Sequence, residues 1–477
     1  MERLIKDGML KFDGADKIPF SRLGIGFEKL DRDVFDPNKA YDKVSKIGVK
    51  KIRLQSGWMK TEKEEGVYDF SWLDDIVDNL ITRGMEPWLC LCYGNPIYTE
   101  LGKTTYGAVG CPPVETEREM NAWLAYVEAT VNHYKGRISL YEIWNEPDCT
   151  YSWKHIGVSK ENIDNERNAR EYGIFASETA KVIKKVDSEA KIAGFAVGHL
   201  SNLKWINDAL VTGVYKYIDY ITFHNYSSND ARRAGNIASL RNLVNLYNPN
   251  IKLIQGETGS QSRSDGNGAM HGFAWTQEKQ VKMLLRTLIC DLHEGLEFTS
   301  YFSTMDMIEA LNGLVGNRAS YLDYGYFGVI SAEFDEDGRS TGNYSEKPSY
   351  YALSALASLL RGNVRAEDIP YVIGVRPSRR VNGLDCEEKN IQIYSFRLDD
   401  GSTAMIYWKK SDILTETFEG TASWCVYGQK NDDIRICDLK DGSLYKLPEE
   451  MIEDLGNGGI RLKNIPITDA PLAVLFR

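Results

Sequence analysis

The chain has 477 residues, of which 43% are hydrophobic and 26% are charged. One hydrophobic core rarely serves more than about 250–300 residues, so we expect a large domain together with a smaller one. Lys and Arg number 57 against 68 Asp and Glu, which gives a net charge of −11. Because nucleic-acid phosphates attract basic surfaces, this balance disfavours nucleic-acid binding.

Signals for membrane insertion and secretion are missing from the sequence. No apolar run approaches the ~18 residues that indicate a transmembrane helix, and residues 1–14 contain no apolar stretch of signal-peptide length. The 8 cysteines form no C-x-x-C pair, which favours free thiols in a reducing compartment. We therefore expect a cytoplasmic protein that does not bind a membrane.

Short apolar runs alternate with longer amphipathic segments over the first three quarters of the chain. Eight runs have the character of strands, at residues 23–28, 49–55, 85–93, 138–144, 191–197, 217–224, 251–257 and 296–302. Helical periodicity follows in segments such as 71–84, 121–136, 168–186 and 276–295. Eight strands with intervening helices predict an α/β fold, a (β/α)₈ TIM barrel over residues 21–361. A doubly wound sheet is the alternative, but no G-x-G-x-x-G follows the first strand.

The sequence pattern changes after residue 361. Short strand-like runs at residues 390–398, 403–410, 422–430, 433–439 and 471–477 are separated by turn signals such as DDGS and KDGS. This pattern predicts a small all-β, sandwich-like domain over residues 362–477. We expect residues 1–20 to join that domain.

Two glutamates stand at the ends of predicted strands. Asn145 and Glu146 end the fourth strand, where Pro147 stops it, and Glu257 ends the seventh. Catalytic residues of TIM barrels lie at the carboxyl ends of the strands, and strands four and seven face each other across the barrel. Two carboxyl groups that meet in this way can hydrolyse a glycosidic bond with retention, if they lie roughly 5–5.5 Å apart.

These residues resemble the signature of the clan A glycoside hydrolases. YEIWNEPD (141–148) resembles their Asn-Glu motif at strand four, and GETG (256–259) matches their strand-seven glutamate by position. Within the clan, SYFSTMDMIE (300–309) and KPSYYAL (347–353) are similar to family 39, which includes β-xylosidases and α-L-iduronidases. The resemblance implies a retaining glycoside hydrolase with Glu146 as acid/base and Glu257 as nucleophile. The sequence departs from the family pattern at Phe302, around Glu257 and after Glu309.

The same resemblance implies roles for further residues. Arg53 is expected to keep Glu257 ionised, Asn145 to bind the sugar 2-hydroxyl, and Tyr226 to donate to the nucleophile. His224 is expected to contact the sugar or orient its neighbours, with a buried structural histidine as the alternative. Further candidates for substrate binding are Glu28, Asn95, Trp275, Tyr301 and Glu309, although the aromatic ones can equally belong to the core.

The sequence favours an exo-acting β-glycosidase on oligosaccharides, with xylosides, galactosides and glucosides all open. An endo-glycanase, a transglycosylase and a non-catalytic carbohydrate-binding barrel are the alternatives. The 6 histidines show no metal-ligand spacing, so no metal and no other cofactor is expected. The expected partner is a glycoside or oligosaccharide, without nucleic acid or membrane, and homo-oligomerisation is left open.

Overall fold

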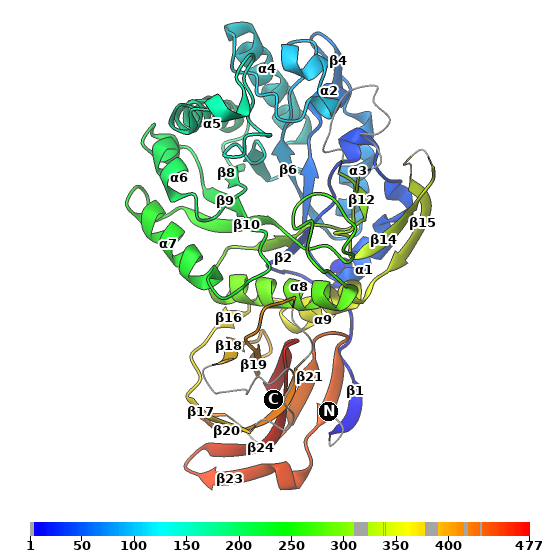
Figure 1. Cartoon of the computed structure of the whole chain (residues 1–477), viewed down its shortest axis with the longest axis vertical. Helices are drawn as coiled ribbons and strands as arrows, with labels where there is room; N and C mark the ends of the chain where they lie inside the picture. Colours follow the sequence, from blue (N-terminus) through cyan, green and yellow to red (C-terminus); the bar gives the residue numbers. More distant parts are fainter. Residues whose placement is uncertain are drawn as a thin grey trace.

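The computed structural model describes residues 4–309, 323–336, 338, 340–376, 390–414, 418–429 and 432–477. Within these ranges a barrel of parallel strands is wrapped by helices, and a region of antiparallel strands lies below it in Figure 1. Helices α8 and α9 lie between the two parts in that view. No helix among the described residues is long and apolar enough to cross a membrane.

Eight parallel strands close the barrel. In barrel order they are β2 (Leu23–Gly26), β3 (Lys51–Gln55), β6 (Glu86–Leu91), β7 (Leu140–Ile143), β8 (Lys191–Val197), β9 (Tyr220–His224), β10 (Lys252–Thr258) and β11 (Thr299–Tyr301). Each strand falls within a predicted run, or extends past it by one residue. The (β/α)₈ fold class is therefore confirmed, and the doubly wound alternative is wrong because the sheet closes on itself.

Helices connect these strands around the outside of the barrel. They are α1 (Tyr41–Ile47), α2 (Trp58–Thr61), α3 (Ser71–Thr82), α4 (Glu117–Tyr134), α5 (Asn165–Val186), α6 (Leu203–Leu210), α7 (Arg233–Asn245), α8 (Gln277–His293) and α9 (Pro348–Leu359). Thr116, Asp164 and Thr276 cap α4, α5 and α8, because each side chain accepts a hydrogen bond from a free amide of the first turn. Such capping sets the residue at which each helix begins.

Short strand pairs extend from the barrel. β4 (Glu62–Glu64) pairs with β5 (Val67–Tyr68), β12 (Met307–Ile308) with β13 (Tyr324–Gly325), and β14 (Ile330–Phe334) with β15 (Ser340–Glu346). The β12–β13 pair and the loop after β10 are joined, because Ser262 N donates to Tyr326 O (2.9 Å) and Asn267 N donates to Tyr324 O (2.8 Å). These contacts form one wall beside the ends of β10 and β11.

The antiparallel region consists of two sheets. The larger has the order β1 (Ile5–Met9), β22 (Ser443–Lys446), β21 (Ile434–Asp438), β25 (Leu472–Phe476), β19 (Thr403–Lys409), β18 (Ile391–Arg397) and β16 (Arg365–Ala366). The smaller has the order β17 (Tyr371–Arg376), β20 (Glu419–Tyr427), β24 (Gly459–Thr468) and β23 (Ile452–Gly456). The additional all-β region of the predicted fold class is thus present, while its independence as a folding domain stays a prediction.

Strand β19, inside the larger sheet, is buried on both faces. Successive side chains of a strand point to opposite sides. Ala404, Ile406 and Trp408 belong to the hydrophobic core that continues into the barrel. Met405 and Tyr407 belong to the separate core between the two sheets. The unbroken apolar run of this strand therefore reflects two cores, one on each side.

A buried ion pair joins α8 to the antiparallel region. Lys282 Nζ lies 2.6 Å from Asp469 Oδ2, and both side chains are almost completely buried. Asp469 Oδ1 also accepts from Phe418 N (3.1 Å), and Asp469 O accepts from Arg286 Nε (3.0 Å). Because removal of one partner leaves a buried charge without compensation, such a pair is costly to break.

We predict that Asp469→Ala lowers the free energy of unfolding by about 3–5 kcal/mol, because the buried Lys282 ammonium group would lose its close partner and, among the described residues, keep only Glu278, at 3.9 Å. Denaturant unfolding followed by circular dichroism measures the change. Asp265→Ala is the control, since Asp265 pairs with Arg263 at the surface with more than half of each side chain exposed, and such a pair contributes about 0–1 kcal/mol. Equal losses in the two variants would contradict the prediction.

Candidate active site

Glu146 and Glu257 meet at the open end of the barrel. One oxygen of each carboxyl group and one nitrogen of His224 all lie within 4.8 Å of one another. Glu146 has a φ of 50° and Trp144 a φ of 66°, a left-handed conformation that costs residues with a Cβ free energy. This tight turn directly after β7 points Glu146 across the mouth of the barrel. The spacing of the two carboxyl groups is close to the roughly 5–5.5 Å that retaining chemistry requires.

A buried arginine from β3 holds Glu257. Arg53 has no exposed surface. Its Nη1 donates to Glu28 Oε1 (2.7 Å) and to Glu257 Oε2 (2.8 Å). Its Nη2 donates to Asn145 Oδ1 and its Nε to Glu142 Oε2, each at 2.8 Å. One guanidinium group therefore orients residues from the ends of several strands.

The other oxygen of Glu257 accepts from a tyrosine. The Tyr226 hydroxyl donates to Glu257 Oε1. Burial and the adjacent Glu257 charge raise the pKa of Tyr226 well above its ordinary value, so the hydroxyl stays a donor. The Tyr226 ring packs edge-on against Phe302 and Phe327, with centroids 6.3 Å and 6.0 Å away. Glu257 is thus held at both oxygens.

Glu146 also has a donor on each oxygen. His224 Nδ1 lies 3.0 Å from Oε1, and the Tyr151 hydroxyl donates to Oε2. Burial alone would raise the pKa of Glu146, but these hydrogen bonds and the nearby positive charges bring it below its ordinary value. Although burial opposes it, the neighbouring Glu257 and Glu146 raise the pKa of His224. Both shifts favour a proton on the imidazole over a proton on the Glu146 carboxyl group in this arrangement.

A third carboxyl group, Glu28, lies beside Glu257. It is 1% exposed. Burial raises the pKa of Glu28 to about 7, because the charge of Glu257 adds to that effect and the Arg53 guanidinium offsets it only in part. Its Oε2 has no hydrogen-bond partner among the described residues. Glu28 therefore carries a proton over part of the neutral pH range and can donate to a ligand.

The structure brings some of the predicted site residues into direct contact and places the others apart from them. The residues joined by direct contacts are Glu28, Arg53, Asn145, Glu146, His224, Tyr226 and Glu257. Asn95 instead supports its own loop, since its Nδ2 donates to Glu62 O (2.8 Å) and its Oδ1 accepts from Ile97 N (3.0 Å). The functional roles of all these residues stay predictions.

The three remaining candidates lie outside that network. Glu309 pairs with Lys29 Nζ at 2.9 Å, and that ammonium group lies 5.7 Å from the Phe302 ring centroid. Trp275 is buried and donates to Met270 O (2.9 Å), and Tyr301 has no exposed surface. Among the described residues, none of the three makes a hydrogen bond to Glu146 or Glu257. The contacts of Trp275 and Tyr301 are those of core residues.

Two residues at the site were missed from the sequence. Glu142 is completely buried within β7, and a charged residue inside an apolar strand is a signal that could have identified it. Tyr151 lies in the loop after Glu146, and its contact depends on how that loop folds back. No spacing rule predicts such a contact.

Two carboxyl groups and an imidazole also form a donor set that metal ions can use. Here Arg53 and Tyr226 already donate to Glu257, while His224 and Tyr151 donate to Glu146. A cation would have to displace these donors and would lie close to the Arg53 charge. The residues present therefore fit hydrogen-bonded carboxyl groups better than metal ligands.

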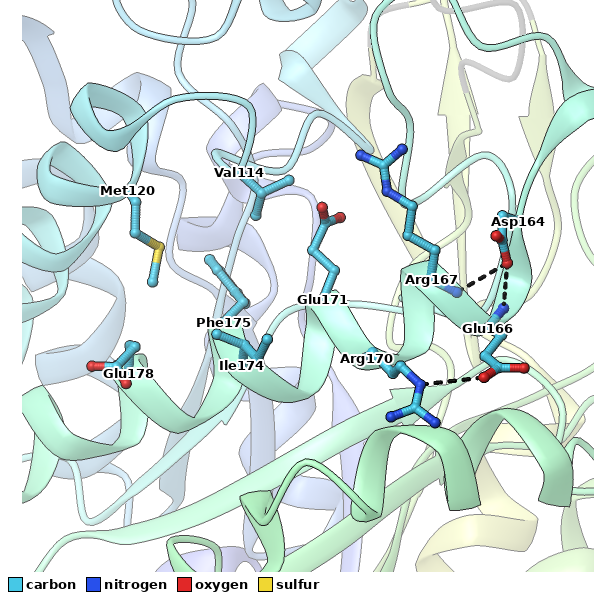
Figure 2. A pocket seen from close by; sticks show the side chains of 10 residues that line it. All are labelled: Val114, Met120, Asp164, Glu166, Arg167, Arg170, Glu171, Ile174, Phe175 and Glu178. Atoms are coloured by element: carbon cyan, nitrogen blue, oxygen red, sulfur yellow. Dashed lines mark hydrogen bonds and ion pairs between the residues drawn. The ribbon is translucent and has the colours of Figure 1, made fainter.

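Two cavities lie near α5. The larger, of about 690 Å³, has a lining from the loop before α4, from α4 and from α5 (Figure 2). The smaller, of about 380 Å³, is lined by residues that include Tyr151, Trp153, Lys154 and Arg167. Neither is lined by Glu146 or Glu257. The smaller cavity approaches the site through Tyr151, whose hydroxyl contacts Glu146.

Comparisons with known proteins find relatives for part of the sequence. The family model for glycosyl hydrolases family 39 matches residues 33–248. A beta-xylosidase of Geobacillus stearothermophilus is 25% identical over 170 residues, which cover 34% of this chain and 31% of that protein. A beta-galactosidase of Clostridium cellulovorans is 38% identical over 148 residues, which cover 27% of this chain and 22% of that protein. The matches therefore span less than a third of either relative.

The fold matches over nearly the whole chain. A solved family 39 glycoside hydrolase from the gut symbiont Bacteroides cellulosilyticus has a TM-score of 0.67 at 16% identity, covering 97% of this chain and 82% of that one. At this identity the likeness concerns the fold alone. The family model and the sequence relatives, in turn, confirm that the chain resembles family 39 of the retaining clan A glycoside hydrolases, which is the enzyme class that the motifs predicted.

Proposed function

We propose that this chain is a retaining, exo-acting β-glycosidase that acts on oligosaccharides, with Glu146 as acid/base and Glu257 as nucleophile. The observation that carries the proposal is the approach of the two carboxyl groups to within 4.8 Å, oxygen to oxygen. A larger separation, of roughly 6.5–9.5 Å, would leave room for a water molecule between sugar and base and would favour inversion.

In the proposed first step, a Glu257 oxygen attacks the anomeric carbon while Glu146 gives its proton to the departing glycosidic oxygen. The bond to the leaving group breaks as the ester bond to Glu257 forms. In the second step, Glu146 takes a proton from water, the resulting hydroxide attacks the anomeric carbon, and Glu257 departs as a carboxylate. The acid/base is thereby restored, and the sugar is released with its original configuration.

The neighbours of the two carboxyl groups support these roles. Arg53 and Tyr226 hold the two oxygens of Glu257, so the nucleophile needs little reorganisation before attack. Asn145 is held by Arg53 next to Glu146. From there, its amide would contact the 2-hydroxyl of the sugar, a hydrogen bond that strengthens in the transition state.

Two observations favour exo action on a β-xyloside or a β-galactoside. The loop after β10 and the β12–β13 pair are hydrogen-bonded into one wall on the Glu257 side, and such a wall would close one end of a binding groove. The sequence relatives described above include a beta-xylosidase and a beta-galactosidase. Assays with a panel of nitrophenyl β-glycosides, alongside a polysaccharide substrate, test both points. Release of internal fragments from the polysaccharide, without hydrolysis of the aryl glycosides, would favour an endo-glycanase.

We predict that Glu257→Ala lowers turnover of the best aryl glycoside by about 10⁴-fold or more, because no covalent intermediate can form. Azide or formate should restore part of the activity, since a small anion fits where the carboxyl group was removed. The rescued product should have inverted configuration, which nuclear magnetic resonance detects. Glu28→Ala is the matched control from the same carboxyl cluster, and rescue in that variant alone would reassign the nucleophile.

We predict that Glu146→Ala depends strongly on the leaving group. Glycosides with poor leaving groups should lose about 10²–10⁴-fold in kcat/KM, which is the usual contribution of acid catalysis. Glycosides with activated leaving groups such as dinitrophenolate should lose far less in this constant, because their bond breaks without protonation. Steady-state kinetics over a series of leaving groups measures the difference, and equal losses across the series would argue against an acid role.

A further inference from the structure

The loop after β7 folds back so that the Tyr151 hydroxyl contacts Glu146. Cys149 N donates to Glu146 O and Ser152 N donates to Cys149 O, each at 2.9 Å. Trp144 Nε1 donates to Ser152 O at 2.8 Å. These bonds hold the backbone on both sides of Tyr151, so the position of its side chain over Glu146 is a feature of the fold.

In this arrangement each oxygen of Glu146 is already in contact with a neighbouring polar group, at the place where a departing oxygen would have to approach. His224 contacts Oε1 and Tyr151 contacts Oε2. A general acid has to present a protonated oxygen within hydrogen-bond reach of the departing oxygen. The leaving group of a substrate therefore competes with one of these two contacts when it binds.

Burial decides which donor leaves. His224 has no exposed surface, and its Nδ1 also lies 3.7 Å from Glu257 Oε2. The Tyr151 residue is 55% exposed, although its hydroxyl end is buried against Glu146. Rotation of this side chain needs no change in the barrel, and a cavity of about 380 Å³ that Tyr151 lines lies beside it.

We propose that the leaving group of the substrate displaces the Tyr151 hydroxyl from Oε2 of Glu146 and takes its place there. The inference rests on the proposed function and deepens it. It assigns Oε2 as the oxygen that protonates the leaving group and the place of the Tyr151 hydroxyl as the start of the leaving-group subsite. Tyr151 is thus a positioning residue.

The charges around Glu146 determine the expected titration. His224 and Arg53 face it from β9 and β3, Glu257 faces it from β10, and Asp148 lies on its own loop. Burial and the Glu146 charge raise the pKa of Tyr151 well above its ordinary value, so the tyrosine itself does not ionise in an ordinary assay. Under this proposal, the contact of Glu146 with the protein that is lost on binding is the hydrogen bond from Tyr151 to Oε2.

The test is the pH profile of Tyr151→Phe with an aryl β-glycoside that the wild type hydrolyses. The basic limb of kcat/KM reports the acid in the free enzyme, and that of kcat reports it in the complex. Loss of a donor to the ionised form raises the pKa of Glu146, so the basic limb of kcat/KM should move up by about one pH unit. The basic limb of kcat should stay in place, because the complex lacks this hydrogen bond already. At pH values well above the wild-type basic limb, kcat/KM divided by its plateau value should be about tenfold higher in Tyr151→Phe than in the wild type.

Tyr217→Phe is the control, since Tyr217 is 37% exposed and lies on the outside of the barrel before β9. It should leave both profiles unchanged. Tyr151→Ala should shift kcat/KM in the same direction as Tyr151→Phe. An unshifted kcat/KM limb in both Tyr151 variants, or equal shifts in kcat and kcat/KM, would overturn the inference while leaving the proposed function intact. A wild type that hydrolyses no glycoside would instead refute the proposed function, and this inference with it.

Discussion

The site depends on one buried guanidinium group. Three carboxyl groups, those of Glu28, Glu142 and Glu257, lie within 2.8 Å of Arg53 nitrogen atoms in the interior of the barrel. Negative carboxyl groups this close to one another and away from water repel each other, and a buried cation among them offsets that repulsion. Arg53, on the second barrel strand, therefore makes it possible for strands one, four and seven to bring acidic side chains to the same point. Its five donors suit this task better than a lysine ammonium group, because they reach several acceptors in fixed directions.

The ends of the strands carry the backbone strain that this arrangement needs. Trp144, Glu146, Phe195 and Ala196 all have positive φ angles, at the adjoining ends of β7 and β8. Each such residue costs roughly 1–3 kcal/mol and persists only where its surroundings compensate. One compensation is visible, since Glu146 N donates to Ala196 O at 2.9 Å. This hydrogen bond links the strained turn after β7 to the end of β8. It therefore fixes the backbone from which the Glu146 side chain reaches the site.

The sequence pattern predicts the parts of this molecule that repeat, and misses those that depend on contacts between distant segments. Alternation of apolar runs with amphipathic segments predicts all eight barrel strands, because burial of a parallel sheet on both sides demands such runs. Their ends then point to Asn145, Glu146 and Glu257 without further knowledge. Trp275, just before α8, and Tyr301, at the end of β11, show the limit, since a tryptophan or tyrosine gives the same sequence pattern in a core as in a binding site. Only the packing around each ring separates the two.

The contact of Tyr151 with Glu146 also could not be predicted from the sequence, but for a different reason. The residues that hold the carboxyl groups come from strands, where close packing leaves them one position. Tyr151 comes from a loop, and its ring is more than half exposed. A site that must be rigid for attack and yet change the protonation of one group can divide the two tasks in this way, with fixed donors on the barrel and one replaceable donor on a loop. A lowered pKa of Glu146 in the empty site is then compatible with its proposed role as an acid, because one of the hydrogen bonds that lower this pKa is the one that a bound leaving group would replace.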